Sequence, residues 1–138
     1  MRDILFRAKK IKSFEEACLC DDPEWVVGLP VSFDTMDDVR AIYQDPWNTH
    51  RIYPDTLGQY TGLNDKNGKM IFEGDIVTTE KDGELQFDGF IVYGHGSFEI
   101  RDPDEPDKDG YCLCLAWSEG FNIIVDGNIY DNGDYFCQ

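Results

Sequence analysis

The sequence predicts a mainly β protein, with a small barrel or sandwich in residues 54–138 and an N-terminal α+β extension in residues 1–53. Two observations lead to this fold class. After residue 53, Asn-Gly and Asp-Gly steps recur, and such steps supply the positive φ that tight turns need. Short segments rich in β-branched and aromatic residues lie between these steps. Several short strands at this spacing are typical of small barrels and sandwiches.

The extension begins with DILFRA, residues 3–8, where apolar and polar residues alternate as expected of an edge strand. The stretch SFEEACLC could begin a short helix, because Ser13 and Glu16 have the spacing of a capping box. WVVGLPVSF, residues 25–33, indicates β structure interrupted by Gly28 and Pro30.

The segment DTMDDVRAIYQDPW, residues 34–47, is the strongest helix candidate in the chain. Asp34 or Thr35 can cap it, and Pro46 can end it. The apolar residues Met36, Val39 and Tyr43 recur at helical spacing. We expect this helix to cover the end of a sheet, with His50 in the linker that follows.

The C-terminal part is expected to contain six strands. These are residues 75–80, 84–87, 90–94, 97–101, 111–117 and 121–125. The stretch RDPDEPDKDG interrupts them and is interpreted as an acidic hairpin loop. Its carboxylates belong to Asp102, Asp104, Glu105, Asp107 and Asp109.

The most patterned stretch is TLGQYTGLNDKNGKMIFEGDIV, residues 56–77. Gly68 indicates a tight reversal, and Glu73-Gly74-Asp75 a sharp turn into a strand, where the aspartate can accept hydrogen bonds from backbone N–H groups. The alternative is an enzyme whose metal ion is held by carboxylates around Asp65, Glu73 and Asp75, with His95 nearby. Turn building is favoured, because Asp and Asn are mainly turn residues in this context and no EF-hand spacing is present.

Four segments together resemble the YopX family of phage and prophage proteins: RDILFRA, WVVG, the block at residues 56–77, and VDGNIYDN. Val27 stands where that family often has an aromatic residue. The resemblance implies a C-terminal SH3-like barrel, and brings with it no activity, cofactor or catalytic residue. The motif residues are Gly58, Gln59, Tyr60, Thr61, Gly62, Leu63, Asp65, Gly68, Glu73, Gly74, Asp75, Gly127, Asn128, Ile129 and Tyr130.

The charge is strongly acidic and uneven. Twelve Lys and Arg against 28 Asp and Glu give −16. Residues 1–12 hold five basic residues and one acid, a local +4, which leaves −20 on the remainder. Nucleic-acid binding is disfavoured, because it normally requires a basic surface. We expect a protein partner from host or phage, with a homo-oligomer as a further alternative.

The remaining candidate sites are weak. Cys18 and Cys20 with Cys112 and Cys114 could form a four-thiolate zinc site, although buried strand cysteines are favoured. No serine stands in a G-x-S-x-G elbow, and no nucleotide-binding glycine motif precedes a Lys-Ser/Thr pair. We therefore expect no cofactor, and an enzyme is the less favoured class. Without an apolar run of about 18 residues, the expected location is the bacterial cytoplasm rather than a membrane.

Overall fold

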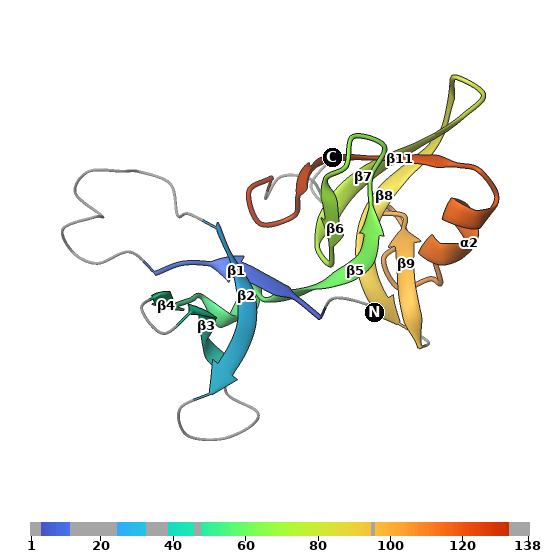
Figure 1. The fold of residues 1–138 in the computed structure, drawn as a ribbon. Helices are drawn as coiled ribbons and strands as arrows, with labels where there is room; N and C mark the ends of the chain where they lie inside the picture. The colour runs from blue at the N-terminus through green and yellow to red at the C-terminus, as the bar shows by residue number, and fades with distance from the viewer. Residues whose placement is uncertain (1–3, 12–24, 33–38, 46–47, 95, 133–138) are drawn as a thin grey trace. The chain divides into compact units, whose positions relative to one another are not determined.

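The computed structural model describes residues 4–11, 25–32, 39–45, 48–94 and 96–132 (Figure 1). The described chain is mainly β, as predicted, with antiparallel strands in two sheets. It divides into two compact units, residues 1–60 and residues 61–138. Strand β5, Gly58–Asn64, begins in the first unit and ends in the second. None of the described helices is long and apolar enough to cross a membrane.

The first unit is a set of antiparallel strands in the order β4-β3-β2-β1-β5. Their bounds are β1 Phe6–Lys9, β2 Trp25–Ser32, β3 Val39–Asp45 and β4 Asn48–Arg51, and a 3₁₀ turn at Pro54–Thr56 precedes β5. The buried side chains of this unit cluster around Ala8, Val26, Ile42 and Ile52.

Strand β1 lies between β2 and β5, so the prediction of an edge strand at residues 3–8 is wrong. Ala8 is fully buried, and Arg7 is nearly so. The guanidinium carbon of Arg7 lies 4.7 Å from the ring centroid of Trp25, a distance at which the cation attracts the face of the ring. Pairing on both sides and this contact explain why a segment with several charges occupies an interior position.

The predicted helix at residues 34–47 is also wrong, because Val39–Asp45 forms strand β3. This strand pairs with β2 on one side and with β4 on the other. Ile42 is fully buried, whereas Tyr43, which belonged to the predicted apolar face, is 37% exposed. Pairing with two neighbours therefore overrides the local capping signals. The helix expected from Ser13 lies outside the described residues.

Two further predictions for this unit are corrected. Strand β2 continues through Gly28 and Pro30 instead of being interrupted by them. A β-carbon at Gly28 would come within 2.3 Å of the carbonyl oxygen of Tyr43, so the glycine permits close approach of β3. His50 does not lie in a linker, because it pairs with Ile42 in the ladder between β3 and β4.

The second unit contains a five-stranded antiparallel sheet in the order β10-β9-β8-β7-β11. The elements of the second unit that follow β5 are, in chain order, β6 Met70–Phe72, β7 Asp75–Lys81, β8 Glu84–Gly94, β9 Ser97–Arg101, β10 Tyr111–Cys112, helix α2 Leu113–Ser118 and β11 Asn122–Asn128. The core of this unit consists of Ile71, Val77, Ile91, Phe98, Ile100, Leu113, Ala116 and Ile123.

The five-stranded sheet is open, and the described strands show no closed barrel; β6 pairs with β5 in the other sheet. Strands β10 and β11 lie at opposite ends of the five-stranded sheet. Strand β10 ends after two residues because the chain turns into helix α2. On β11, the N–H of Val125 and the carbonyl of Ile123 bond to the turn that follows β5.

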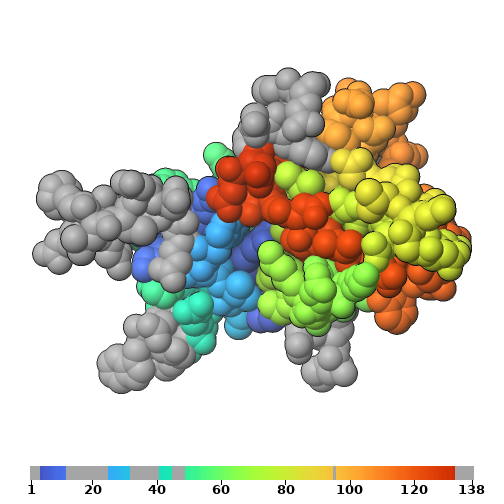
Figure 2. Space-filling view, turned by 90° about the horizontal axis from the view of Figure 1, so that it is seen from above, coloured from blue at the N-terminus to red at the C-terminus, as the bar shows by residue number. Residues whose placement is uncertain are grey.

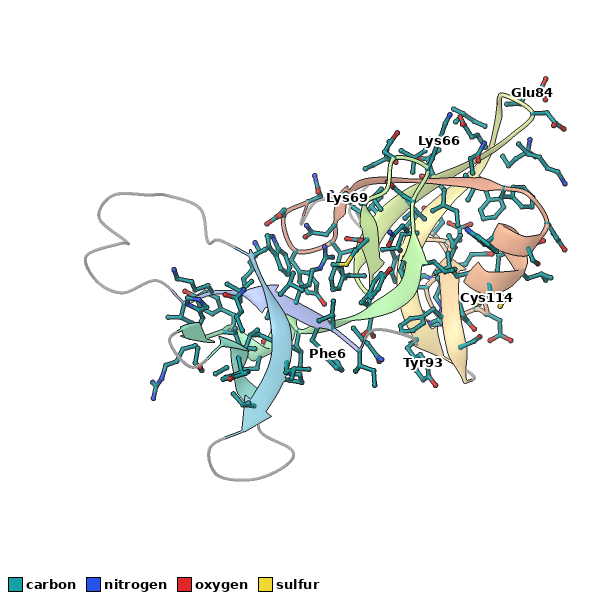
Figure 3. All side chains as sticks on the ribbon, in the orientation of Figure 1. Phe6, Lys66, Lys69, Glu84, Tyr93 and Cys114 are labelled. Atoms are coloured by element: carbon teal, nitrogen blue, oxygen red, sulfur yellow. The ribbon has the colours of Figure 1, made fainter. Side chains whose placement is uncertain are left out.

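Two local predictions fail for related reasons. Residues 111–117 are not one strand, because α2 buries Leu113 and Ala116 at the three-residue spacing of a helix. Cys112 therefore lies on a strand and Cys114 on a helix, where it is exposed (Figure 3). Asp88-Gly89 is not a turn, since β8 runs unbroken through it. A β-carbon at Gly89 would meet the carbonyl oxygen of Arg101 at 2.5 Å, so this glycine permits the close approach of β9 to β8.

Candidate functional site

Asp65 organises the turn between β5 and β6, where the sequence places a tight reversal. Its Oδ1 accepts hydrogen bonds from the N–H groups of Asn67, at 2.9 Å, and Lys69, at 2.8 Å. Its Oδ2 accepts from the N–H of Val125 in β11, at 3.1 Å. Lys66 and Lys69 extend from the same turn (Figure 3). The carboxylate thus joins the reversal to a strand that is distant in sequence.

These contacts determine the protonation of Asp65. Burial by itself would raise the pKa of the carboxyl group. The N–H groups of Val125, Lys69 and Asn67, with the positive charge of Lys69, outweigh burial together and lower the pKa below its ordinary value of 3.8. The carboxylate is therefore held ionised as a hydrogen-bond acceptor, which is unsuited to transferring protons near neutral pH.

The turn at Glu73-Gly74-Asp75 has the geometry that the turn interpretation requires. Gly74 has a φ of +93°, and Oδ2 of Asp75 accepts a hydrogen bond from the N–H of Phe72 at 2.8 Å. The N–H of Gly74 donates to the carbonyl of Ile91 at 2.8 Å. Asp75 is 1% exposed, so its carboxylate lies inside the unit and fixes the entry of β7.

The last motif segment meets this turn. The N–H of Ile129 donates to the carbonyl of Gly74 at 2.9 Å, and Asn128 pairs with Asp75 in the ladder between β11 and β7. Oδ1 of Asn128 accepts from the N–H groups of Tyr130, at 3.0 Å, and Asp131, at 2.8 Å, which reverses the chain after β11. Motif residues separated by about fifty positions thus build one junction.

The remaining motif residues lie on or next to β5. Gly58 and Gln59 pair with Arg7 and Phe6 of β1 in the first unit. The N–H of Tyr60 donates to the carbonyl of Leu5 at 2.8 Å. Within residues 61–138, the positive-φ glycines include Gly62, at +89°, and Gly68, at +84°, while Thr61 and Leu63 lie on β5 and Gly127 on β11.

The metal-site alternative gains no support from this geometry. Oxygens of Asp65 and Asp75 accept backbone hydrogen bonds, as described above. No three His, Cys, Asp or Glu side chains gather as a metal site anywhere in the described ranges. His95, Cys18 and Cys20 lie outside those ranges. Of the four cysteines in the zinc hypothesis, the structure therefore describes Cys112, on strand β10, and Cys114, on helix α2.

A second feature of residues 61–138 has the chemistry of a binding site. It is a solvent-open hollow of about 360 Å³. We call it the acidic hollow, and its lining residues are Phe87, Asp88, Ile100, Asp102, Asp109, Gly110 and Tyr111. The acidic loop, residues 102–110, supplies one side of it and is exposed at the surface in orange in Figure 2.

The register of the sheet explains how the acidic hollow forms. Tyr111 pairs with Ile100 between β10 and β9, so Asp109 and Asp102 lie just beyond the paired ends of adjacent strands. Asp88 belongs to β8, the next strand across. Asp102 and Asp109 therefore lie at one opening with Phe87 and Tyr111, and the lining contains no basic residue. Asp88 alternates with Phe87 along β8, so its side chain points to the opposite face of the sheet.

Aromatic rings form the apolar side of the hollow. The centroids of Phe87 and Tyr111 are 5.4 Å apart, and Phe121 packs against Phe87 at 5.8 Å. The hydroxyl of Tyr111 donates a hydrogen bond to a carboxylate oxygen of Glu119. This bond, followed by burial and the charge of Glu119, raises the pKa of Tyr111 above 10.0, so the ring stays neutral. The same bond restricts the ring's rotation.

The acidic loop was singled out from sequence, whereas Phe87, Asp88 and Tyr111 were missed. A signal for them exists. Phe87-Asp88-Gly89 and Asp109-Gly110-Tyr111 each combine an aromatic residue, an aspartate and a glycine. Asp-Gly steps are typical of turns, and this local interpretation conceals that the two steps flank β9 from either side.

Fold and site thus define a mainly β protein whose motif residues build turns and whose second unit carries an acidic hollow. The chain belongs to the YopX protein family, whose model matches residues 30–135, well over half of the chain. This confirms the family resemblance. A similar solved structure is the crystal structure of protein EF1440 from Enterococcus faecalis, with 23% identity, 99% of each chain covered and a TM-score of 0.48. No curated protein matches significantly.

Proposed function

We propose that this protein is a phage- or prophage-encoded accessory protein that acts in the bacterial cytoplasm by binding a basic protein of host or phage. The observation that supports this best is the acidic loop, residues 102–110. Its five carboxylates are exposed, and its single basic residue, Lys108, forms an ion pair with Glu105 at 2.8 Å. An exposed group of like charges on a chain of net charge −16 favours a partner of opposite charge.

Binding is preferred to catalysis because the family-motif carboxylates are already used structurally. The oxygens of Asp65 and Asp75 hold turns together, and the amide oxygen of Asn128 holds a third. In a metal-dependent enzyme built around Asp65, Glu73 and Asp75, the metal ion would share the oxygens of both aspartates with the backbone N–H groups that they already bind. The same negative charge disfavours a nucleic-acid target.

The test is capture of the partner by the full chain, from bacteria in which the gene is expressed, followed by reconstitution with the purified partner. We expect a basic protein whose affinity falls steeply with salt, because the Debye length shrinks from about 10 Å at 0.1 M to about 3 Å at 1 M. Binding that is unchanged at high salt would contradict the electrostatic basis. Sedimentation of the chain alone at the same salt concentrations separates this result from homo-oligomer formation.

A further inference from the structure

We propose that the acidic hollow binds an arginine side chain of the protein partner. This inference rests on the proposed function and adds a location and a chemical group to it. Its support comes from the shape, the aromatic wall and the charge of the hollow, which are independent of the overall acidity of the chain. The volume of about 360 Å³ lies within the range of roughly 300–1,000 Å³ that is usual for ligand sites.

The aromatic wall suits a flat cation. Phe87 and Tyr111 are half-buried, with their rings 5.4 Å apart and inclined at 42°. A cation is attracted to the face of such a ring within about 6 Å, and a guanidinium group also stacks on it. An ammonium group gains the first of these interactions but not the second.

The carboxylates suit the same group. Asp102 and Asp109 are exposed at the opening, on the continuations of the adjacent strands β9 and β10. Oδ1 of Asp102 accepts from the N–H of Asp104 at 2.9 Å, and a carboxylate retains further acceptor positions after one such bond. Guanidinium donors form a planar fork that can bond two carboxylate oxygens at once.

The walls are held in place before any ligand arrives. Oγ1 of Thr79 donates to the carbonyl of Phe87 at 2.8 Å and accepts from its N–H at 3.2 Å. Tyr111 is held by Glu119. At Gly110, a β-carbon would meet the carbonyl oxygen of Ile100 at 2.3 Å, so a larger residue would push the two strands apart. Preorganised walls reduce the ordering cost of binding.

The direct test uses small probes on the isotopically labelled full chain. We expect Nα-acetyl-arginine amide to shift the amide resonances of residues 87–88, 100–102 and 109–111, with saturation in the millimolar range. Nα-acetyl-citrulline amide has nearly the same shape without the charge, and should give no saturable shift. Nα-acetyl-lysine amide should bind more weakly than the arginine probe. Equal effects of all three probes, or shifts confined to other residues, would overturn the proposal.

A matched pair of variants tests the hollow in the partner complex. Asp102→Asn with Asp109→Asn removes two carboxylates from the lining, whereas Asp104→Asn with Asp107→Asn removes two from the same loop outside it. Both variants carry the same net charge, and their amide spectra verify folding. We expect the first variant to weaken binding of the arginine probe and of the partner about fivefold, which corresponds to the loss of two exposed ion pairs. The second variant should weaken binding of both much less.

The outcomes distinguish the two proposals. Equal weakening of partner binding by both variants would refute the arginine site while leaving an electrostatic partner in place. A hollow that binds the arginine probe selectively, in a chain for which no basic partner is found, would refute the proposed function while the site itself stands.

Discussion

The ring of Tyr130 lies directly against Gly74: a β-carbon built at position 74 would come within 2.8 Å of Cε2 of Tyr130. The two residues belong to different family-motif segments, and the N–H of Ile129 bonds to the carbonyl of Gly74 beside this contact. Glycine is thus required at position 74 for two reasons, the positive φ and the aromatic ring.

A comparison of two glycines separates these reasons. Gly68 has a similar φ of +84°, but a β-carbon there would meet nothing within 4 Å. Gly68→Ala should cost about 1–2 kcal/mol of unfolding free energy from backbone strain, and Gly74→Ala about 1–3 kcal/mol more from the added clash. Urea denaturation of both variants measures the difference. In a Tyr130→Leu background the extra cost at position 74 should shrink, and an unchanged cost would show that Tyr130 does not cause it.

The Asp65→Asn variant should lose stability. Its NH₂ group would replace one of the two accepting oxygens, and would then face either the N–H of Val125 or the N–H groups of the turn. We expect a loss of roughly 1–3 kcal/mol at pH 7, as for a buried donor that loses its partner. Asp102→Asn, in an exposed turn, provides a comparison and should cost less.

The pH dependence of the same variant follows from the lowered pKa. The folded protein holds the Asp65 carboxyl ionised below its ordinary pKa of 3.8. The contribution of this carboxylate to the free energy of unfolding is therefore complete above pH 3.8, and it is lost as the pH falls through the lower pKa of the folded state. The stability difference between wild type and Asp65→Asn should therefore stay constant above pH 3.8 and narrow progressively as the pH falls below it. Thermal melts on both sides of that pH check it, and a difference that stays constant on both sides would show that the charge is unimportant.

Asn128→Asp should be destabilising although it keeps Oδ1, which accepts from the N–H groups of Tyr130 and Asp131. Nδ2 of Asn128 donates to Oδ2 of Asp131 at 2.9 Å, and a carboxylate in its place would face another carboxylate. We expect a loss of about 1–3 kcal/mol at neutral pH. Adding Asp131→Asn should restore much of it, because the donor and acceptor are then exchanged. If the second substitution restored nothing, the contact between the two side chains would not be the cause.

Thr79→Val tests the hydroxyl that supports the acidic hollow. Thr79 is fully buried at a register shift between β7 and β8, and its oxygen bonds to both backbone groups of Phe87. Valine has nearly the same shape but leaves those groups unsatisfied, at a cost of roughly 1–3 kcal/mol. Thr79→Ser keeps the hydroxyl and loses one methyl group, at about 0.8 kcal/mol. Denaturation should therefore rank valine as the more damaging change, and the reverse order would assign the role of Thr79 to packing.

Two of the five predicted Asn-Gly and Asp-Gly turns form, whereas Asp88-Gly89 and Asp126-Gly127 lie within strands β8 and β11 and Asp109-Gly110 precedes β10. At the two reversals that form, Gly68, Asp82 and Gly83 adopt positive φ, a conformation that is a local property of these residues. The helix predicted at residues 34–47 failed because Ile42 is buried by strands on both sides, which no local pattern records. The described strands show no closed barrel, because they pair in two open sheets, which is a matter of long-range pairing rather than of local sequence.

The candidate site was predictable in part. The acidic loop is evident from its composition, and the Asp75 turn from its Gly-Asp step. The acidic hollow needed the register between β9 and β10, since only that register brings Tyr111 beside Ile100 and places Asp109 near Asp102. The contact between Gly74 and Tyr130 likewise joins segments whose separation hides it from any local pattern.

The bond from Val125 to Asp65 also bears on how this protein behaves when it is concentrated. Strand β11 ends the five-stranded sheet, and Asp65 and Lys66 occupy the N–H of Val125 and the carbonyl of Ile123 on it. At the opposite end, β10 offers only two residues before the chain turns into α2. An exposed sheet border is where other molecules add as further strands and fibrils begin. Loss of the Asp65 side chain would therefore expose a template for aggregation as well as loosen a turn.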